Sequence, residues 1–333
     1  MITIITIIYF IKTYKIGYYN IISVYTYNIW QTLYLSDNKE NIMKAYEDGN
    51  RVVIDGIKDF DPKHIFECGQ CFRWHLQEDG SYTGVAMGRV INVKREDDKV
   101  YIDNTNLEDY KNIWYDYFDL GTDYGKIKDD LKKYDKYLEE AVKFGWGIRI
   151  LRQDSWEMLI SFIISSNNRI PMIQRAIENL SERYGEYIGE YRGKKYYAFP
   201  DAEVLSKVPV EEIRECKTGF RDKYIKSTSE RVVEEGVDVK SFRKMDTEEC
   251  RKRLIEYNGV GPKVCDCISL FGMQKIDTFP VDVWVKRVMQ EFYVDEEMSL
   301  TRIRKFALDK FGELSGYAQQ YLFYYARELG IGK

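Results

Sequence analysis

Lys263 and Asp282 are the two residues whose types and positions point most directly to chemistry. Lys263 falls in the first turn of an expected helix, directly after the turn Gly259–Pro262. The positive end of a helix disfavours a cation, so the same field should favour the neutral amine, which is the nucleophilic form. Asp282 follows Val281 and precedes another expected helix, which makes it a candidate N-cap. A capping role can coexist with a chemical one.

The turn before Lys263 has the pattern of a helix–hairpin–helix motif, at about residues 247–271. One helix is expected to end at Asn258-Gly259, and Pro262 suits the first turn of the next helix. Gly259 and Gly261 permit positive φ and the close approach of another backbone. The unpaired amides that start the second helix would then suit a DNA phosphate without reading any base. The alternative interpretation is an ordinary helix–turn–helix corner capped by glycines.

The elements expected to position these residues begin with short strands. The strand-like runs are Arg51–Asp55, Cys71–His75, Tyr82–Ala86, Arg89–Lys94 and Val100–Asp103. The breaks between them are polar or contain glycine, which indicates an antiparallel meander. An N-cap signal at residues 104–108 then begins a helical region that continues to the end of the chain.

Helical patterns dominate the remainder of the sequence. Long helical runs are expected within residues 155–184, helices at 216–235, 246–257, 263–271, 282–292 and 300–329, and a small hairpin at 187–200. The fold class is therefore α+β. An N-terminal twisted antiparallel β-sheet domain at residues 43–135 is expected to precede a mostly α-helical domain at residues 136–333.

Residues 1–42 form an N-terminal extension of unusual composition. The first 36 residues contain no Asp or Glu and are dominated by Ile and Tyr. We interpret the segment as translated AT-rich DNA outside the gene, with Met43 as the candidate start. The alternatives are an interfacial anchor or an extra strand. The apolar run at residues 1–11 is too short to span a bilayer, and no other stretch is long enough.

The composition narrows the classes of chemistry. The chain has 333 residues with 50 Lys+Arg, 54 Asp+Glu and only two histidines, and its formal net charge is −4. His-based catalysis and a His-rich metal site are therefore poor interpretations. A basic excess is typical of nucleic-acid binders, so any contact with DNA must depend on a local patch. The charged n-region of a secretory signal is missing, and we expect reduced thiols and a cytoplasmic protein.

The cysteines offer one competing interpretation. Cys68-Gly-Gln-Cys71 is a C-x-x-C pair, which is found in redox proteins and in zinc sites. A redox pair usually lies in a βαβ unit, whereas the expected sheet is antiparallel. The other close pair, Cys265 and Cys267, is separated by one residue, which does not suit zinc. We expect no metal site.

Two segments together suggest a family. Gly259–Lys263 combined with Pro280–Asp282 resembles the helix–hairpin–helix DNA glycosylase superfamily, in which the lysine marks the bifunctional branch. Four further segments are similar to the 8-oxoguanine DNA glycosylases of the eukaryotic type: Gly69–Trp74, Ser165–Asn168, Gly219–Tyr224 and Gly316–Phe323. The segments occur in the same order and cover roughly residues 51–328. Each segment alone is weak, and together they are specific.

The resemblance implies a base-excision repair enzyme that flips 8-oxoguanine out of duplex DNA, removes it and nicks the strand. Lys263 would attack C1′ and form a Schiff base before β-elimination, and Asp282 would stabilise the cationic sugar. The Gly69 carbonyl would accept a hydrogen bond from N7–H, which guanine lacks. Gln319 would bind the Watson–Crick edge and Phe323 would stack on the base. Cys267 would lie under the base.

The resemblance also implies how DNA is held. Asn167, Phe220 and Arg221 would fill the gap left in the duplex. Gly259 and Gly261 would contact phosphate, with help from local cations such as Arg221, Lys223, Lys286 and Arg287. The partner would be double-stranded DNA containing oxidised guanine, bound by a monomer in the nucleoid. No cofactor is expected apart from a monovalent cation at the hairpin. No iron–sulfur cluster is expected, because no cysteine follows Cys267.

Several alternatives stay open on the residues alone. Phe323 and Cys267 also fit as core residues, and Gln319 fits as a surface amide. The protein as a whole also fits a non-catalytic helix–hairpin–helix DNA-binding protein, or a glycosylase for another damaged base. Within the same superfamily, the endonuclease III branch shares the lysine and aspartate but ends in a four-cysteine iron–sulfur loop, which this sequence lacks after Cys267. The monofunctional alkylpurine glycosylases lack the lysine, so Lys263 argues against them.

The sequence departs from the family pattern at four positions. Arg169 and Met172 stand where the eukaryotic enzymes have a third Asn and an Arg that contacts the opposite cytosine. Phe220 replaces a Tyr, and Trp284 replaces a His near the backbone. Because a guanidinium that reads cytosine is lost, we expect weaker discrimination among the bases opposite the lesion.

Overall fold

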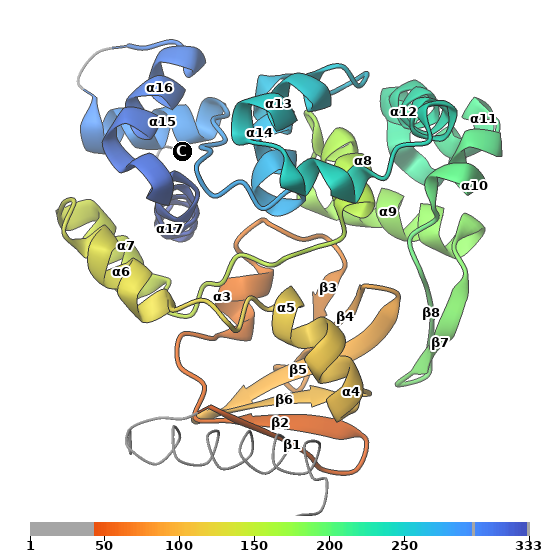
Figure 1. Cartoon of the computed structure of the whole chain (residues 1–333), viewed down its shortest axis with the longest axis horizontal. Helices are drawn as coiled ribbons and strands as arrows, with labels where there is room; N and C mark the ends of the chain where they lie inside the picture. The colour runs from red at the N-terminus through yellow and green to blue at the C-terminus, as the bar shows by residue number, and fades with distance from the viewer. Residues whose placement is uncertain (1–42, 295–296, 332–333) are drawn as a thin grey trace, which may run out of the picture. The chain divides into compact units, whose positions relative to one another are not determined.

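The described part of the chain contains a six-stranded antiparallel sheet in the order β1-β2-β6-β5-β4-β3 (Figure 1). The computed structural model describes residues 43–294 and 297–331, so the interpretation of residues 1–42 lies outside it. The strands are β1 (Lys44–Glu47), β2 (Arg51–Asp55), β3 (Trp74–Leu76), β4 (Tyr82–Ala86), β5 (Arg89–Glu96) and β6 (Lys99–Asp103). The expected antiparallel sheet is confirmed. The sequence analysis missed β1, an exposed edge strand without apolar alternation.

The strand expected at 71–75 is instead mostly a loop, and this loop carries Gly69. The short helix α3 (Pro62–Phe66) leads into it, and Phe66 stacks on Trp74 of β3 with ring centroids 3.9 Å apart. Gln70 is fully buried, and its Nε2 donates to the Arg149 carbonyl at 2.7 Å. Gln70 thereby ties the loop to the segment that precedes the helix at Ser155–Ser165.

Helices dominate the chain after residue 106, and Figure 1 shows those after residue 123 above the sheet. Their order is α4 (Leu107–Asp109), η1 (Tyr110–Trp114), α5 (Tyr115–Tyr117), α6 (Tyr124–Lys132), α7 (Lys136–Phe144), α8 (Ser155–Ser165), α9 (Ile170–Tyr184), α10 (Ala202–Lys207), α11 (Val210–Ile213), η2 (Arg214–Thr218), η3 (Gly219–Arg221), α12 (Asp222–Glu235), η4 (Val239–Lys244), α13 (Thr247–Ile255), α14 (Pro262–Phe271), α15 (Val283–Tyr293), α16 (Leu300–Phe311), η5 (Gly312–Leu314) and α17 (Ser315–Leu329). The expected small hairpin is present as β7 (Tyr187–Tyr191) and β8 (Lys194–Tyr197). The α+β class is confirmed.

The helical runs expected within residues 155–184 are α8 and α9, which are separated by a loop at residues 166–169. One expected long helix is divided in two. The run 300–329 forms α16 and α17, because Gly312 adopts a φ of +53° and ends the first helix. The loop at 166–169 lies at the active site, as shown below, so the division matters for function.

Helix α8 lies at the centre of the helical core. Residues 158–164 are all buried, and the helix packs against α9 and α14. A helix that is apolar on nearly every face is expected to be surrounded by protein. Its two ends therefore remain the places where its polar residues meet open space.

No helix among residues 43–294 and 297–331 is long and apolar enough to cross a membrane. The boundary that the sequence analysis placed between residues 135 and 136 stays a prediction.

Candidate active site

The helix–hairpin–helix motif is formed by α13 and α14, which are joined by residues 256–261. Gly259 adopts a φ of +86°, and a Cβ there would lie 2.7 Å from Cδ2 of Tyr224. Both the backbone conformation and the space therefore require glycine. Gly261 is different, because its φ of −84° is ordinary and does not use the freedom that glycine permits. A Cβ on Gly261 would meet nothing within 4 Å and the residue is exposed, so this end of the hairpin is open to a ligand.

Lys263 and Asp282 line one cavity of about 910 Å³. Lys263 lies in the first turn of α14, and Asp282 is the N-cap of α15. The Oδ1 of Asp282 accepts the backbone N–H of Val285 at 2.8 Å, so the expected capping role is confirmed. Its second carboxylate oxygen is left to serve the cavity. The loop between α8 and α9 forms another wall through residues 165–168.

The electrostatics at Lys263 differ from the sequence-based expectation. The sulfur of Cys267 and the carboxylate of Asp282 raise the pKa of Lys263 above its ordinary value, although burial opposes them. The expectation that the helix end would favour the neutral amine is therefore wrong for the protein without DNA. Burial raises the pKa of Cys267 above its ordinary value, and the neighbouring Lys263 opposes this. Lys263 is an ammonium at neutral pH and must lose a proton before it can attack carbon.

The residues expected to hold the damaged base come together from two distant parts of the chain. Gly69 has a φ of +86°, and a Cβ there would lie 3.2 Å from Cε1 of Phe323 on α17. The Phe323 ring meets Trp284 edge to face, with centroids 5.0 Å apart. Phe323 is only half-buried, whereas Cys267 is buried. The loop around Gly69 and α17 thus face each other beside the start of α15.

Gln319 is not a surface amide. It is 5% exposed, and its Oε1 has no hydrogen-bond partner among the residues that the structure describes. Its neighbour Gln320 is satisfied, because its Nε2 donates to the Cys68 carbonyl at 3.0 Å. A buried acceptor without a partner is costly, which makes Gln319 a candidate for ligand binding.

Arg221 holds the loop between α8 and α9. Its side chain is 6% exposed and donates to the backbone carbonyls of Ser166, Asn167 and Thr218. Asn167 at the tip of this loop adopts a left-handed φ of +49°. Arg221 therefore joins two of the segments expected to enter the duplex, by bonding to backbone rather than by projecting into solvent.

Phe220 presents the exposed aromatic surface of this region. It is 55% exposed, and the Arg221 guanidinium lies 4.3 Å from its ring centroid. The other predicted cations lie elsewhere. On α15, Lys286 pairs with Glu297 at 3.1 Å and Arg287 is exposed, while Lys223 is exposed on α12. The structure brings Asn167, Phe220 and Arg221 together, with Lys223 close to them in sequence.

One group on the cavity wall was missed by the sequence analysis. Asp266 on α14 is buried between Arg251 of α13 and Arg304 of α16, and all three residues line the cavity. The sequence did contain a signal for this group, because Asp266 is an acid on the apolar face of an expected helix. A carboxylate buried in that way requires cationic partners. Its partners could not be identified from sequence spacing.

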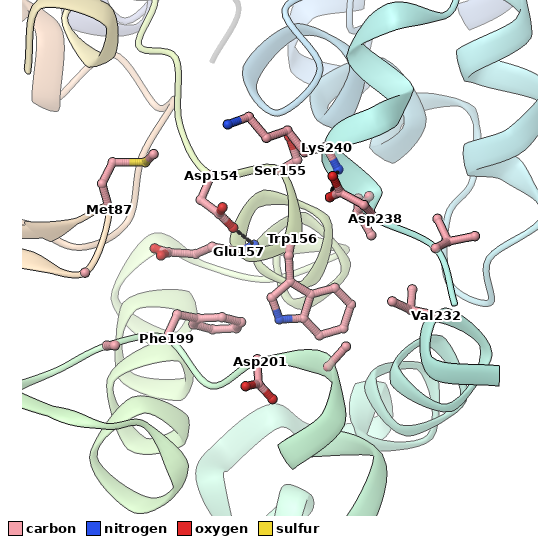
Figure 2. A pocket seen from close by; sticks show the side chains of 15 residues that line it. Met87, Asp154, Ser155, Trp156, Glu157, Phe199, Asp201, Val232, Asp238 and Lys240 are labelled. Atoms are coloured by element: carbon pink, nitrogen blue, oxygen red, sulfur yellow. Dashed lines mark hydrogen bonds between the residues drawn. The ribbon is translucent and has the colours of Figure 1, made fainter. Parts of the chain in front are cut away.

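A second cavity lies at the opposite end of α8 (Figure 2) and has the opposite charge. It has a volume of about 530 Å³, and its ionisable lining residues are Asp154, Glu157, Asp201, Asp238 and Lys240. Three of these acids accept a backbone N–H at the start of a helix. Four carboxylates against one ammonium would repel a phosphate backbone, so this cavity is not a candidate for DNA chemistry.

Comparison with known families agrees with this geometry. Residues 52–159 match the family described as 8-oxoguanine DNA glycosylase, N-terminal domain. Residues 160–313 match the HhH-GPD superfamily base excision DNA repair protein family. The chain is 33% identical to a probable N-glycosylase/DNA lyase of Methanothermobacter thermautotrophicus, over 59% of this chain and 69% of that protein. It is 30% identical to the N-glycosylase/DNA lyase OGG1 of Arabidopsis thaliana, over 78% of this chain and 75% of that protein.

Solved structures give a stronger match. The structure of MBOgg1 in complex with a low-affinity DNA ligand is 53% identical, with a TM-score of 0.84 over 87% of this chain and 99% of that one. The 8-oxoguanine glycosylase/lyase of Clostridium acetobutylicum is 49% identical, with a TM-score of 0.84 over 86% of this chain and 99% of that one. Fold and site thus define a helix–hairpin–helix DNA glycosylase. The chain belongs to the 8-oxoguanine DNA glycosylase family of N-glycosylase/DNA lyases.

Proposed function

We propose that the protein removes 8-oxoguanine from duplex DNA and nicks the strand through a Schiff base on Lys263. The observation that carries the proposal is the shared cavity of Lys263 and Asp282, whose nucleophile is flanked by a carboxylate and a thiol. The solved complex of the Clostridium acetobutylicum relative contains double-stranded DNA with cytosine opposite 8-oxoguanine. Such DNA is the substrate class that this proposal assigns to the present chain.

The first chemical step is displacement of the base. The ammonium of Lys263 loses a proton, and the free amine attacks C1′ of the flipped nucleotide. Asp282 accepts the lysine proton and stabilises the positive charge that develops on the sugar. The bond from C1′ to the base breaks, and the base leaves with the electron pair of that bond and with the proton that Asp282 had taken up.

The second step breaks the strand. Opening of the sugar ring converts the C1′ adduct to an imine, which acidifies the hydrogens on C2′. Loss of one of these protons expels the phosphate at C3′, and water then hydrolyses the imine to return free Lys263. Atoms and charges balance without an oxidant, a reductant or a metal ion.

Recognition of the base depends on Gly69, Gln319 and Phe323. The Gly69 carbonyl would accept the N7–H that 8-oxoguanine carries and guanine lacks. One such bond contributes about 0.5–1.5 kcal/mol net, but two facing acceptors in a buried site cost more. The Oε1 of Gln319 matches the donors on the Watson–Crick edge of guanine, and Phe323 offers a stacking surface.

Borohydride trapping tests the proposal directly. The intact protein should form a covalent complex with duplex DNA containing 8-oxoguanine, and Lys263→Gln should abolish both the complex and strand nicking. We expect at least a thousandfold loss, as is typical when a nucleophile is removed. Lys305→Gln, an exposed lysine on α16, is the matched control and should trap normally.

The trapping result also decides between this proposal and a non-catalytic hairpin protein. A protein that binds the duplex but yields no complex and no free base would support the non-catalytic alternative. A monomer without required cofactor, a monovalent cation at the hairpin and a cytoplasmic, nucleoid-associated location remain predictions. Loss of duplex binding on removal of K⁺ or Na⁺ would support the cation at the hairpin.

A further inference from the structure

The cavity wall contains more positive charge than its acids balance. The Oδ2 of Asp266 lies 2.8 Å from Nε of Arg304, and its Oδ1 pairs with Arg251 and accepts the hydroxyl of Thr278 at 3.0 Å. Asp266 is 1% exposed, so it is a fixed anion between two guanidiniums. The three groups therefore carry one net positive charge.

The two arginine side chains that carry this charge are mostly shielded from solvent. The side chains of Arg251 and Arg304 are 11% and 19% exposed. Nη2 of Arg304 is buried and has no hydrogen-bond partner within the described ranges. Two further acids, Glu248 and Asp277, act on this pair, but both are exposed and largely screened; Glu248 lies 3.6 Å from Arg251 and is 69% exposed. A second buried arginine is an expensive way to neutralise one carboxylate, so stability alone does not explain the pair.

The backbone around the cavity favours an anion as well. Helices α14 and α16 both begin at this cavity, through residues 261–264 and 300–301. Neither helix has an acid in its first turn, whereas α8, α10 and α13 each do. Helix starts without acids leave their positive ends available to an anionic ligand.

We propose that Arg251 and Arg304, held by Asp266, form a subsite for a backbone phosphate of the damaged nucleotide. This proposal rests on the glycosylase/lyase function proposed above. The guanidinium fork suits a phosphate oxygen, and the subsite lies in the same cavity as the Lys263 nucleophile. The two phosphates that flank the flipped sugar share this chemistry. The 3′ phosphate is the leaving group of β-elimination, and the 5′ phosphate anchors the nucleotide.

The test is a double-mutant cycle between Arg304→Gln and a neutral methylphosphonate placed at either flanking phosphate. With all phosphates charged, Arg304→Gln should slow single-turnover nicking about tenfold. With the methylphosphonate at the bound phosphate, the same substitution should change the rate less than about twofold. Loss of the effect at the 3′ position identifies the leaving group, and loss at the 5′ position identifies the anchor. Equal effects of Arg304→Gln on all three duplexes would overturn the subsite.

Controls separate the subsite from folding and from the proposed function. Asp266 keeps one arginine when the other is replaced, so single variants leave no unpaired buried carboxylate. Arg251→Gln should reproduce the coupling and Arg304→Lys should retain part of it, while Lys305→Gln on the same helix should show none. An active wild-type enzyme without coupling overturns the subsite alone. A wild-type protein that neither releases 8-oxoguanine nor traps with borohydride overturns the proposed function instead.

Discussion

The two ends of α8 differ in charge although they belong to one helix of 11 residues, about 16 Å long. The active-site cavity at its C-terminal end is lined by Arg251, Lys263 and Arg304 against two acids. The cavity at its N-terminal end has four acids against one lysine. A chain with a formal net charge of −4 can therefore bind DNA, because its acids are segregated from the face that does so.

Asp282 and Asp201 provide the sharpest comparison, because both are N-caps and each lines one of the two cavities. Asparagine also caps helices, so Asp282→Asn and Asp201→Asn should both keep the free energy of unfolding within about 0.5 kcal/mol. Asp282→Asn should slow base release about a hundredfold, since it removes the charge that stabilises the sugar cation. Asp201→Asn should leave the rate unchanged. Urea unfolding and single-turnover kinetics measure both effects, and equal rates for the two variants would contradict the assignment of Asp282.

The pH dependence of base release is the next largest effect. Because the pKa of Lys263 is raised above its ordinary value, the fraction of free amine should grow about tenfold per pH unit below that pKa. Single-turnover rates should therefore rise up to pH 9 without a plateau. Cys267→Ala removes the first cause of the raised pKa, so its profile should shift to lower pH. A wild-type plateau near pH 7 would show that the pKa is lowered instead.

Discrimination among opposite bases should be weak. Met172, exposed at the start of α9, offers no guanidinium where the eukaryotic enzymes have the Arg that reads cytosine, and the exposed Arg169 stands in place of their third Asn. Replacing cytosine opposite the lesion should reduce base release less than about tenfold, below the cost of losing a bidentate pair. Met172→Arg should increase the preference for cytosine. A steep preference for cytosine in the wild type would contradict this expectation.

Glu157 in the acidic cavity should affect stability and leave catalysis unchanged. Burial raises its pKa to about 7, and Arg73 only partly opposes this. A carboxyl whose pKa is raised on folding stabilises the folded state at pH values below its unfolded pKa, about 4.3. That contribution is lost as pH rises toward 7. The free energy of unfolding should therefore fall between pH 5 and 7, and Glu157→Gln should flatten this fall without changing base release.

The sequence predicted the parts of the fold that local patterns determine. The bounds of β2 and β4 match because apolar runs are bracketed by turn residues, and α14 begins at the expected proline. The position of the break between α8 and α9 was not predicted, although Pro171 in the first turn of α9 signalled a helix start. Strand β1 carried no comparable signal, since its residues are exposed at a sheet edge.

The site was predictable where motifs carried it and unpredictable where tertiary contacts did. Lys263 and Asp282 were found from their positions after turns. The Asp266 pair was not, because Arg251 and Arg304 come from two other helices. The direction of the Lys263 pKa was not predicted either, because the helix end is only one influence on the lysine. Cys267 on the same helix and Asp282, which reaches the lysine through the fold, both raise the pKa of Lys263.

The bonds from Arg221 to the loop backbone have a consequence for the speed of the search for damage. The Asn167 tip is fixed in a left-handed conformation before any DNA arrives. Ordering one residue costs about 1–2 kcal/mol, and a loose loop would incur that cost at every undamaged base pair it tests. Because the loop is already ordered when the protein has folded, each encounter with an undamaged base pair can be short. The enzyme can then inspect many pairs for each lesion that it repairs.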